Sequence, residues 1–245
     1  MTSVVITMAG FGRRFLDAGY TVPKYRIVVH GRSLFAWSML SLRSFIEQGA
    51  PFTFVVRGAD QAEDFIRSEA RALGIVSLGL VQLDTPTDGQ ATSAMLARPA
   101  IEEPRAPMLI YNIDTFVHPD ALPAHAVRGA GWIPCFEAKG DAWSFAAADQ
   151  QGRVTEVREK QRISRHATIG LYYFSSFERY AEIYACHYAD RTRMEKGEAY
   201  VAPMYNTLIA QGDEVFIHDV PVQAVIPLGV PEEVERFRAG EAPQL

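Results

Sequence analysis

The sequence contains few cysteines and no long hydrophobic segment. Its two cysteines, Cys135 and Cys186, lie far apart and match no metal-binding spacing, which favours a reduced, cytoplasmic protein. The six histidines show no metal-ligand spacing either. No run of about twenty apolar residues occurs, and no charged segment followed by an apolar one opens the chain. The sequence therefore predicts neither a membrane span nor a secretion signal.

The chain also has fewer basic than acidic residues. The chain has 24 lysines and arginines against 29 aspartates and glutamates, a formal net charge of −5. This balance argues against a nucleic-acid duplex or an anionic membrane as the main partner. A bound anion must therefore meet a local group of cations. The 245 residues, 48% of them hydrophobic, are enough to bury the core of one α/β domain.

The first half alternates short apolar runs with segments of helical periodicity. Such alternation predicts a doubly wound sheet, whose ligands bind beyond the carboxyl ends of its strands. Gly10 to Arg14 and Asp114 each follow a predicted strand, so they can meet at one edge. The predicted strands are 3–8, 52–56, 75–81 and 107–113, and the predicted helices are 34–48, 60–73 and 90–97.

The second half is richer in strands, and no linker separates it from the first. We predict a single domain, 1–245, with a nucleotide-binding half of about 1–130 and an acceptor-binding half of about 131–245. The expected strands are 131–137, 142–149, 153–159, 167–174, 214–219 and 223–228, and the expected helices are 177–188, 203–211 and one from Pro231.

The segment "MAGFGRRFLDAGYTVPK" after the first strand is typical of a phosphate-binding loop. It lacks the third glycine of the dinucleotide fingerprint, and no GK[ST] follows, so neither the Rossmann motif nor the P-loop is present. A tight turn would explain Gly10 and Gly12 equally well. Arg14 and the later Lys24 favour phosphate, because glycines let backbone amides approach phosphate oxygens and the cations supply charge.

Six pieces, in order, resemble the sugar-phosphate nucleotidylyltransferases. The resemblance implies a Rossmann-like, three-layer α/β/α sandwich with a central mixed, mostly parallel sheet, of the GT-A-like nucleotidyltransferase type. The family reaction is attack by an acceptor phosphate on the α-phosphorus of a nucleoside triphosphate, with release of pyrophosphate. The pieces are G-x-G-x-R with P-K (Gly10, Gly12, Arg14, Pro23, Lys24), "DTPTDGQATSAMLA", "YNID", "REK", "ATIGLYYF" and "LGVPEEVERF".

The resemblance assigns roles in the first half. It implies that Arg14, Lys24 and Asp114 are catalytic and that Asp114 also holds Mg²⁺, which binds a few carboxylates together with phosphate oxygens and water. A capping or turn aspartate is the alternative for Asp114. The "DTPTDG" segment is a good surface turn by composition alone, and the base preference is not predicted. The implied nucleotide-binding residues are Ala9, Gly10, Gly12, Arg13, Gln82 and Gly89.

The second half is expected to bind the acceptor. Lys160 would pair with its phosphate and Glu159 would face its hydroxyls, although a solvated charge run with Arg158, Arg162 and Arg165 is the alternative. "GEAYVAPMYN" resembles a subset of the family from capsule, lipopolysaccharide and unusual phosphoester pathways. A sugar 1-phosphate is the favoured acceptor, and a phospho-amino-acid or a phosphocholine-like compound is the alternative. The implied acceptor-binding residues are Glu159, Lys160, Gly170, Glu198, Tyr200 and Asn206.

Three departures keep other hypotheses open. Where the family usually has a small hydroxylic residue, this chain has Arg13, and where the family has an apolar pair after Pro-Lys, it has Tyr25-Arg26. Pro227 stands where many sugar enzymes of the family have an aspartate that binds a second metal. A carboxylate such as Glu198 could substitute, or the chain could be a catalytically silent relative. A glycosyltransferase is the other rival, although such enzymes usually carry D-x-D. The expected partners are a nucleoside triphosphate and a phosphorylated small molecule, without nucleic acid or membrane, and a homodimer is left open.

Overall fold

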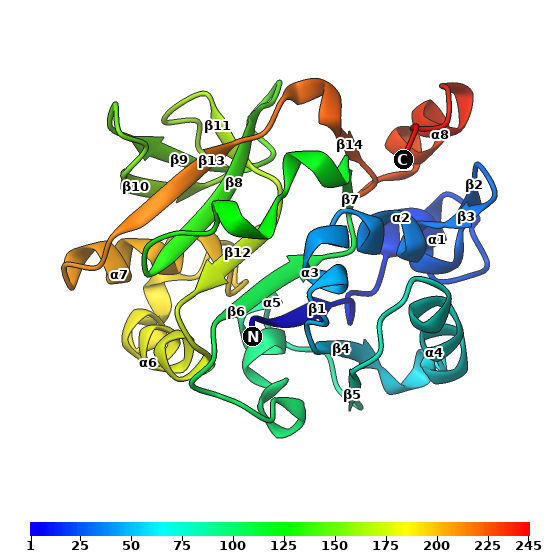
Figure 1. Cartoon of the computed structure of the whole chain (residues 1–245), viewed down its shortest axis with the longest axis horizontal. Coiled ribbons are helices and arrows are strands. Elements are labelled where there is room, and N and C mark those ends of the chain that lie inside the picture. The colour runs from blue at the N-terminus through cyan, green and yellow to red at the C-terminus, as the bar shows by residue number, and fades with distance from the viewer.

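A ten-stranded mixed sheet runs through the computed structural model, which describes residues 1–245 (Figure 1). Its strands are β1 (Ser3–Thr7), β4 (Phe52–Arg57), β5 (Leu78–Leu83), β6 (Met108–Asn112), β8 (Gly131–Glu137), β9 (Ser144–Ala148), β10 (Val154–Glu159), β11 (His166–Thr168), β12 (Leu171–Phe174) and β13 (Val215–Asp219). Their order is β10-β9-β11-β8-β12-β6-β1-β4-β5, and β13 pairs with β8.

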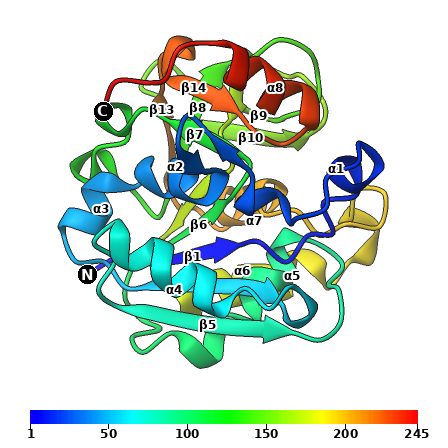
Figure 2. The same ribbon diagram turned by 90° about the vertical axis from the view of Figure 1, so that its right-hand side faces the viewer.

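The parallel pairs of the first half set the position of the site. Strands β6, β1, β4 and β5 are mutually parallel, and antiparallel β12 joins β6 to the strands of the second half. Figure 2 shows β1 and β5 running in the same direction, with α1 (Arg13–Asp17) beyond the carboxyl end of β1. The predicted α/β fold with a mixed central sheet is confirmed.

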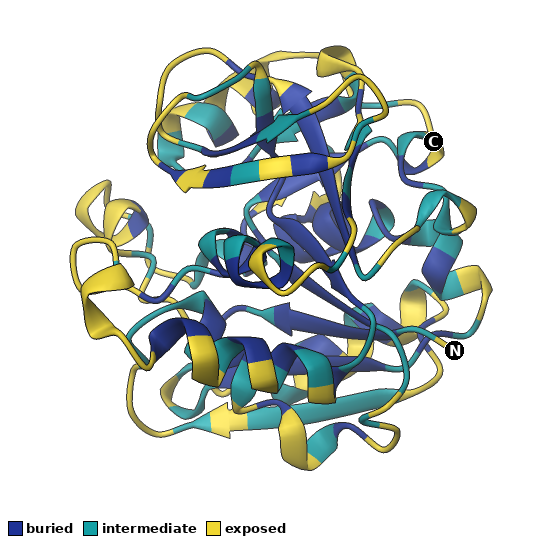
Figure 3. Ribbon diagram, turned by 90° about the vertical axis from the view of Figure 1, so that its left-hand side faces the viewer, coloured by how far each residue is buried: buried dark blue, intermediate teal, exposed yellow.

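Helices cover both faces of the sheet and bury two main cores. Because side chains alternate along a strand, Val4 and Ile6 of β1 enter one core and Val5 enters the other. Figure 3 shows the strands buried beneath helices whose outer faces are exposed. One core includes α2 (Leu34–Leu40), α3 (Arg43–Glu47) and α4 (Glu63–Ala72), and the other includes α5 (Gln90–Met95), α6 (Phe177–Tyr188) and α7 (Tyr205–Ala210).

A third, smaller core joins the end of the chain to the first half. Trp37 of α2 packs edge-on against Phe116 and against Phe237 of α8 (Pro231–Ala239). Strand β14 (Val225–Pro227) pairs with β7 (Thr115–Val117), directly after Asp114. The hairpin of β2 (Val28–Val29) and β3 (Arg32–Ser33) lies beside α8. None of the helices has the length and apolar character needed to cross a membrane.

Two predicted elements are each divided in the structure, and some short strands were not predicted. The single helix expected at 34–48 is two helices, because the backbone leaves the helical conformation at Leu42, with φ −100° and ψ 20°. The Ser41 hydroxyl just before this break accepts a hydrogen bond from Val117 N at 2.9 Å. The strand expected at 167–174 is interrupted at Gly170, whose φ of 82° is left-handed. The prediction also missed β7 and the hairpin of β2 and β3, which are too short to show a pattern.

Candidate active site at the carboxyl ends of the parallel strands

The predicted phosphate loop follows β1 directly. Gly12 has a φ of 60°, and a Cβ added at Gly10 or Gly12 would meet no atom within 4 Å, so both backbones face open space. Ala9 is half-buried where the loop leaves the sheet. Arg13 and Arg14 are exposed, and neither pairs with a carboxylate. The loop therefore presents accessible backbone and two unpaired guanidinium groups.

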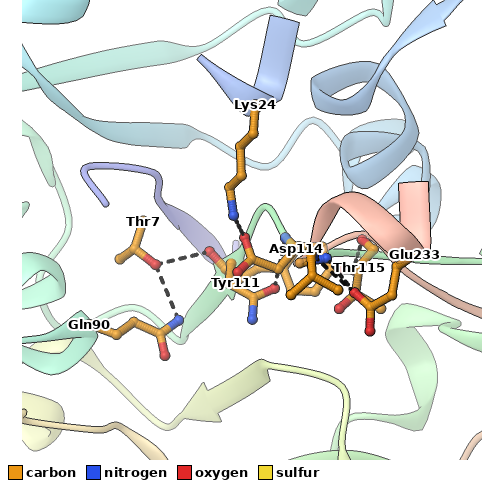
Figure 4. Close-up of polar contacts among 10 residues, drawn as sticks. Thr7, Lys24, Gln90, Tyr111, Asp114, Thr115 and Glu233 are labelled. Carbon is orange, nitrogen blue, oxygen red and sulfur yellow. Dashed lines mark hydrogen bonds and ion pairs between the residues drawn. The ribbon is translucent and has the colours of Figure 1, made fainter. Parts of the chain in front are cut away.

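Lys24 and Asp114 lie together beside this loop. Lys24 begins a 3₁₀ turn, Lys24–Arg26, and its ammonium forms an ion pair with Asp114 Oδ1, as Figure 4 shows. Asp114 follows β6, the neighbour of β1, so the two parallel strands deliver the loop and the carboxylate to one edge. The Asp114 side chain is 41% exposed and that of Lys24 only 19%, which leaves the carboxylate open to a ligand from solvent.

The turn at Asp114 is fixed by residues from distant parts of the chain. Its carbonyl accepts a hydrogen bond from Leu228 N, and its backbone N donates to Asn112 Oδ1 at 3.3 Å. Pro227 pairs with Thr115, so the position without an aspartate does lie beside Asp114. Glu233 accepts hydrogen bonds from Gly229 N at 2.8 Å and Val230 N at 3.1 Å (Figure 4). Glu233 thus makes its half of a capping box, while Val230 has no side-chain acceptor for the other half, and these bonds hold the β14–α8 connection beside Asp114.

The donor set around Asp114 suits Mg²⁺ bound mainly through substrate. No group of three or more His, Cys, Asp or Glu residues could hold a metal ion by itself. The Glu198 carboxylate, the suggested substitute for Pro227, accepts a hydrogen bond from the Tyr200 hydroxyl. Magnesium is commonly held by one or two carboxylates plus phosphate oxygens and retained water. Asp114 can supply the one protein carboxylate that such a site needs.

Gly170 supports this turn from the second half of the chain. A Cβ at Gly170 would overlap the side-chain amide of Asn112, the same side chain that accepts from Asp114 N. Sequence reasoning predicted an acceptor contact for Gly170. The observed contact gives it a positioning role toward Asn112 and, through Asn112, toward Asp114, and the acceptor contact stays a prediction.

The turn before α5 carries the predicted base-recognition residues. Gly89 has a φ of 149°, and a Cβ there would lie 2.8 Å from the Ala199 carbonyl carbon. A hydrogen bond from Ala91 N to the Ala199 carbonyl, 3.0 Å long, joins the start of α5 to the segment around Ala199. Gln82 is exposed near the end of β5, the neighbour of β4. Gln90, which sequence reasoning missed, donates to Thr7 Oγ1 at 3.2 Å and so ties this turn to β1 (Figure 4).

Replacing Gly89 with alanine tests this close approach. The added methyl group would push the turn away from Ala199, so we expect a lower melting temperature and a KM for the triphosphate raised by about tenfold or more. Gly212→Ala is the matched control, because Gly212 also has a positive φ, 89°, but open space around its Cβ position. Steady-state kinetics and thermal unfolding of both variants measure the difference. If both variants changed the melting temperature and the KM equally, the requirement for glycine at position 89 would come from its positive φ and not from the close approach of Ala199.

Four predicted acceptor residues are brought together in the second half. Lys160 has a φ of 51°, and its ammonium lies 4.5 Å from the Tyr200 ring centroid and 3.7 Å from Glu159 Oε1. It donates to the Tyr200 hydroxyl, which in turn donates to Glu198. The Glu159 side chain is buried and accepts from Ser144. Burial raises the pKa of Glu159, while the Ser144 hydrogen bond and the Lys160 charge oppose that shift.

The remaining cations of this segment are already paired or exposed. Arg158 pairs with Glu156, and Arg162 pairs with Asp141 and donates to the Ala138 carbonyl. Arg165 is exposed and makes no ion pair. Lys160 is therefore the cation of this run that faces the group of Glu159, Glu198 and Tyr200.

Asn206 is bound to β10 through both polar atoms of its side-chain amide. Its side-chain oxygen accepts from Val157 N, and its side-chain nitrogen donates to Val157 O, both at 2.8 Å. The amide thus continues the backbone hydrogen bonding of β10 and fixes α7 against the sheet. The predicted place of Asn206 in the acceptor pocket stays a prediction, and the acceptor site proposed below is argued from Glu159, Lys160 and Tyr200.

The sheet, the phosphate loop and the Lys24–Asp114 pair together define an α/β enzyme of the nucleotidyltransferase class. No protein-family model matches the sequence, and no curated protein does. Among solved structures the chain is similar to a nucleoside-diphosphate-sugar pyrophosphorylase from Vibrio cholerae RC9, with 35% identity, 97% of this chain and 100% of that chain covered, and a TM-score of 0.89. The chain belongs to the sugar-phosphate nucleotidylyltransferase family, as its motifs predicted.

Two more distant structures share the fold. One is an inositol-1-phosphate CTP transferase from T. maritima, with 17% identity over 99% of this chain and 98% of that chain and a TM-score of 0.74. The other is a UDP-glucose pyrophosphorylase complexed with UDP-glucose, with 15% identity over 98% of this chain and 97% of that chain and a TM-score of 0.77. The same architecture thus accompanies different nucleotides and acceptors, so the fold alone does not select either.

Proposed function

We propose that this nucleotidyltransferase moves a nucleoside monophosphate from a nucleoside triphosphate to a sugar 1-phosphate and releases pyrophosphate. The observation that carries the proposal is the contact of Lys24 with Asp114 beside an open, glycine-rich loop. This arrangement offers backbone amides and a cation to phosphates, with a carboxylate for a metal next to them. The similarity to the nucleoside-diphosphate-sugar pyrophosphorylase from Vibrio cholerae supports the sugar acceptor.

The proposed reaction is an in-line displacement at phosphorus. An acceptor phosphate oxygen forms a bond to the α-phosphorus as the bond to the α,β-bridging oxygen breaks, and that oxygen leaves with pyrophosphate. Such transfers depend mainly on positioning and charge neutralisation. The Gly10 and Gly12 amides and Arg14 would hold the triphosphate. Lys24 would turn from Asp114 to the charge that gathers on the departing pyrophosphate.

Asp114 would hold Mg²⁺ together with phosphate oxygens of the bound nucleotide. When bound, Mg²⁺ neutralises phosphate charge and so favours both attack and departure. Because Pro227 supplies no carboxylate, the chain would contribute a single anionic ligand and rely on the nucleotide for the others. Substrate and metal binding are then expected to depend on each other.

The acceptor phosphate would displace Tyr200 from Lys160, and Glu159 would accept hydrogen bonds from acceptor hydroxyls. A phosphate carries more charge than a phenol hydroxyl, so it competes well for the ammonium. Nucleotide-activated sugars serve as donors for glycan assembly, which is the basis for proposing a role in capsule or polysaccharide biosynthesis. A cytoplasmic location stays a prediction.

Replacing Lys160 with alanine tests the acceptor site. We expect a higher KM for the acceptor and a loss in kcat/KM of about 2–4 kcal/mol, the scale for one charged hydrogen bond in a desolvated site. Triphosphate affinity, measured by calorimetry, should hardly change. Arg158→Ala removes a neighbouring exposed cation paired with Glu156 and is the matched control. Equal weakening of both ligands would place Lys160 in the nucleotide site or the support of the fold.

The function itself is tested by pyrophosphate release. The protein is incubated with UTP, dTTP, CTP or GTP, each paired with sugar 1-phosphates and with phosphocholine, and products are identified by mass spectrometry. We expect pyrophosphate together with a nucleoside-diphosphate sugar for at least one pair, and loss of both with EDTA. Release of nucleoside diphosphate from a nucleotide sugar would indicate a glycosyltransferase. No pyrophosphate from any pair would contradict the proposal.

A further inference from the structure

Arg57 brings a further cation to the phosphate loop from a different strand. It is the last residue of β4, which pairs in parallel with β1, so its side chain starts at the edge where the loop begins. Its guanidinium lies 5.0 Å from the ring centroid of Phe11, the residue between the two loop glycines. The guanidinium of Arg13 lies 5.3 Å from the same ring. Phe11 therefore contacts two cations while its own side chain stays 42% exposed.

An ion pair with Asp60 fixes the position of the Arg57 side chain. The Asp60 carboxylate, whose side chain is only 5% exposed, pairs with Arg57 and accepts a hydrogen bond from the Tyr25 hydroxyl at 3.4 Å. Arg26 donates to the Gln61 carbonyl at 3.0 Å and lies over the Phe65 ring. Residues 25 and 26 directly follow Lys24. The connection after β4 thus holds Arg57 and the Lys24 turn in one unit.

This corner of an acidic protein carries unbalanced positive charge. Arg13, Arg14 and Arg26 form no ion pair, whereas Arg57 is paired with Asp60 through Nη2 and its Nε is buried without a hydrogen-bond partner. Stacking on Phe11 orients the Arg57 guanidinium without using an N–H donor, so the terminal N–H donors that Asp60 does not take stay available to a ligand. A planar set of donors beside an open phosphate loop matches phosphate oxygens.

We propose that Arg57 binds the outer phosphates of the triphosphate and of the departing pyrophosphate, oriented by Phe11 and held by Asp60. The assignment rests on the proposed function for the identity of the ligand. The nucleotide would enter with its outer phosphates between the loop and the end of β4. Phe11 is then a positioning residue, and its exposed ring serves the two arginines.

The test uses inorganic tripolyphosphate and inorganic phosphate as probes, titrated calorimetrically into the full-length protein. We expect Arg57→Gln to weaken tripolyphosphate binding by about tenfold and phosphate binding by less than twofold. Phe11→Leu keeps an apolar side chain but no ring, and about threefold weakening is expected. Arg57→Lys keeps the charge beside Asp60 but loses the planar stacking, so its affinity should lie between those of Arg57→Gln and the unaltered protein. Arg67→Gln removes an exposed arginine of α4, paired with Glu63, and is the matched control.

The outcomes separate this inference from the proposed function. Thermal unfolding of each variant first establishes that it is folded, and Phe11→Leu alters only an exposed loop side chain. Tripolyphosphate affinity in Arg57→Gln within twofold of the unaltered protein would overturn the role of Arg57, even if pyrophosphate release continued. Equal weakening for phosphate and tripolyphosphate would overturn the assignment to the outer phosphates. An Arg57-dependent tripolyphosphate site without pyrophosphate release for any substrate pair would support the anion site and refute the nucleotidyl transfer.

Discussion

Replacing Asp114 with asparagine is expected to lower turnover by about a thousandfold, equivalent to about 4 kcal/mol of transition-state stabilisation. In the proposed site the Asp114 carboxylate would be the anionic metal ligand, because Pro227 occupies the neighbouring place. Asparagine is nearly isosteric with aspartate. The bonds that fix the turn, from Leu228 N and to Asn112, involve backbone atoms of residue 114 and are retained.

The melting temperature should therefore change little. The lost ion pair with Lys24 is partly exposed and contributes little stability. Steady-state pyrophosphate release and thermal unfolding measure the two effects, with Asp120→Asn, an exposed aspartate of the 3₁₀ turn Pro119–Ala121, as the control. Near-normal turnover of Asp114→Asn, or unchanged turnover of the unaltered protein in EDTA, would exclude the metal role.

Replacing Lys24 with alanine should lower kcat by about a hundredfold and triphosphate affinity much less. The ammonium matters most when negative charge collects on the leaving pyrophosphate, so its loss affects the transition state more than the ground state. The same change removes the cation from Asp114, so Mn²⁺ alone should bind more tightly to Lys24→Ala than to the unaltered protein. Kinetics with the triphosphate varied, together with titration of Mn²⁺ followed by electron paramagnetic resonance, measure both quantities.

Lys139→Ala is the matched control, since Lys139 is exposed and makes no ion pair. An unchanged kcat in the Lys24→Ala variant would mean that Lys24 has no catalytic role and that the glycine-rich loop is a simple tight turn. Unchanged Mn²⁺ binding would mean that the Lys24–Asp114 contact does not compete with the metal.

The sequence predicted the features that local patterns and strand order determine. The meeting of the loop with Asp114 was predictable, because parallel neighbours end at the same edge of a sheet. The contacts of Gly170, Asn206 and Arg57 were not, since each joins residues at least 46 positions apart. Glu233 was visible only as a glutamate near the start of a helix, and its partners at Gly229 and Val230 appear once the helix is placed.

The dependence of Asp114 on the last segment has a consequence for how the protein is made. Leu228 holds the Asp114 turn, and β14 covers β7, so residues synthesised more than a hundred positions after the aspartate complete its surroundings. A nascent chain that has emerged only to residue 220 can form β1, β4, β5 and β6 but leaves β7 without its partner strand. Chains released early from the ribosome would expose that strand to other molecules, and none of them would have a finished turn at Asp114.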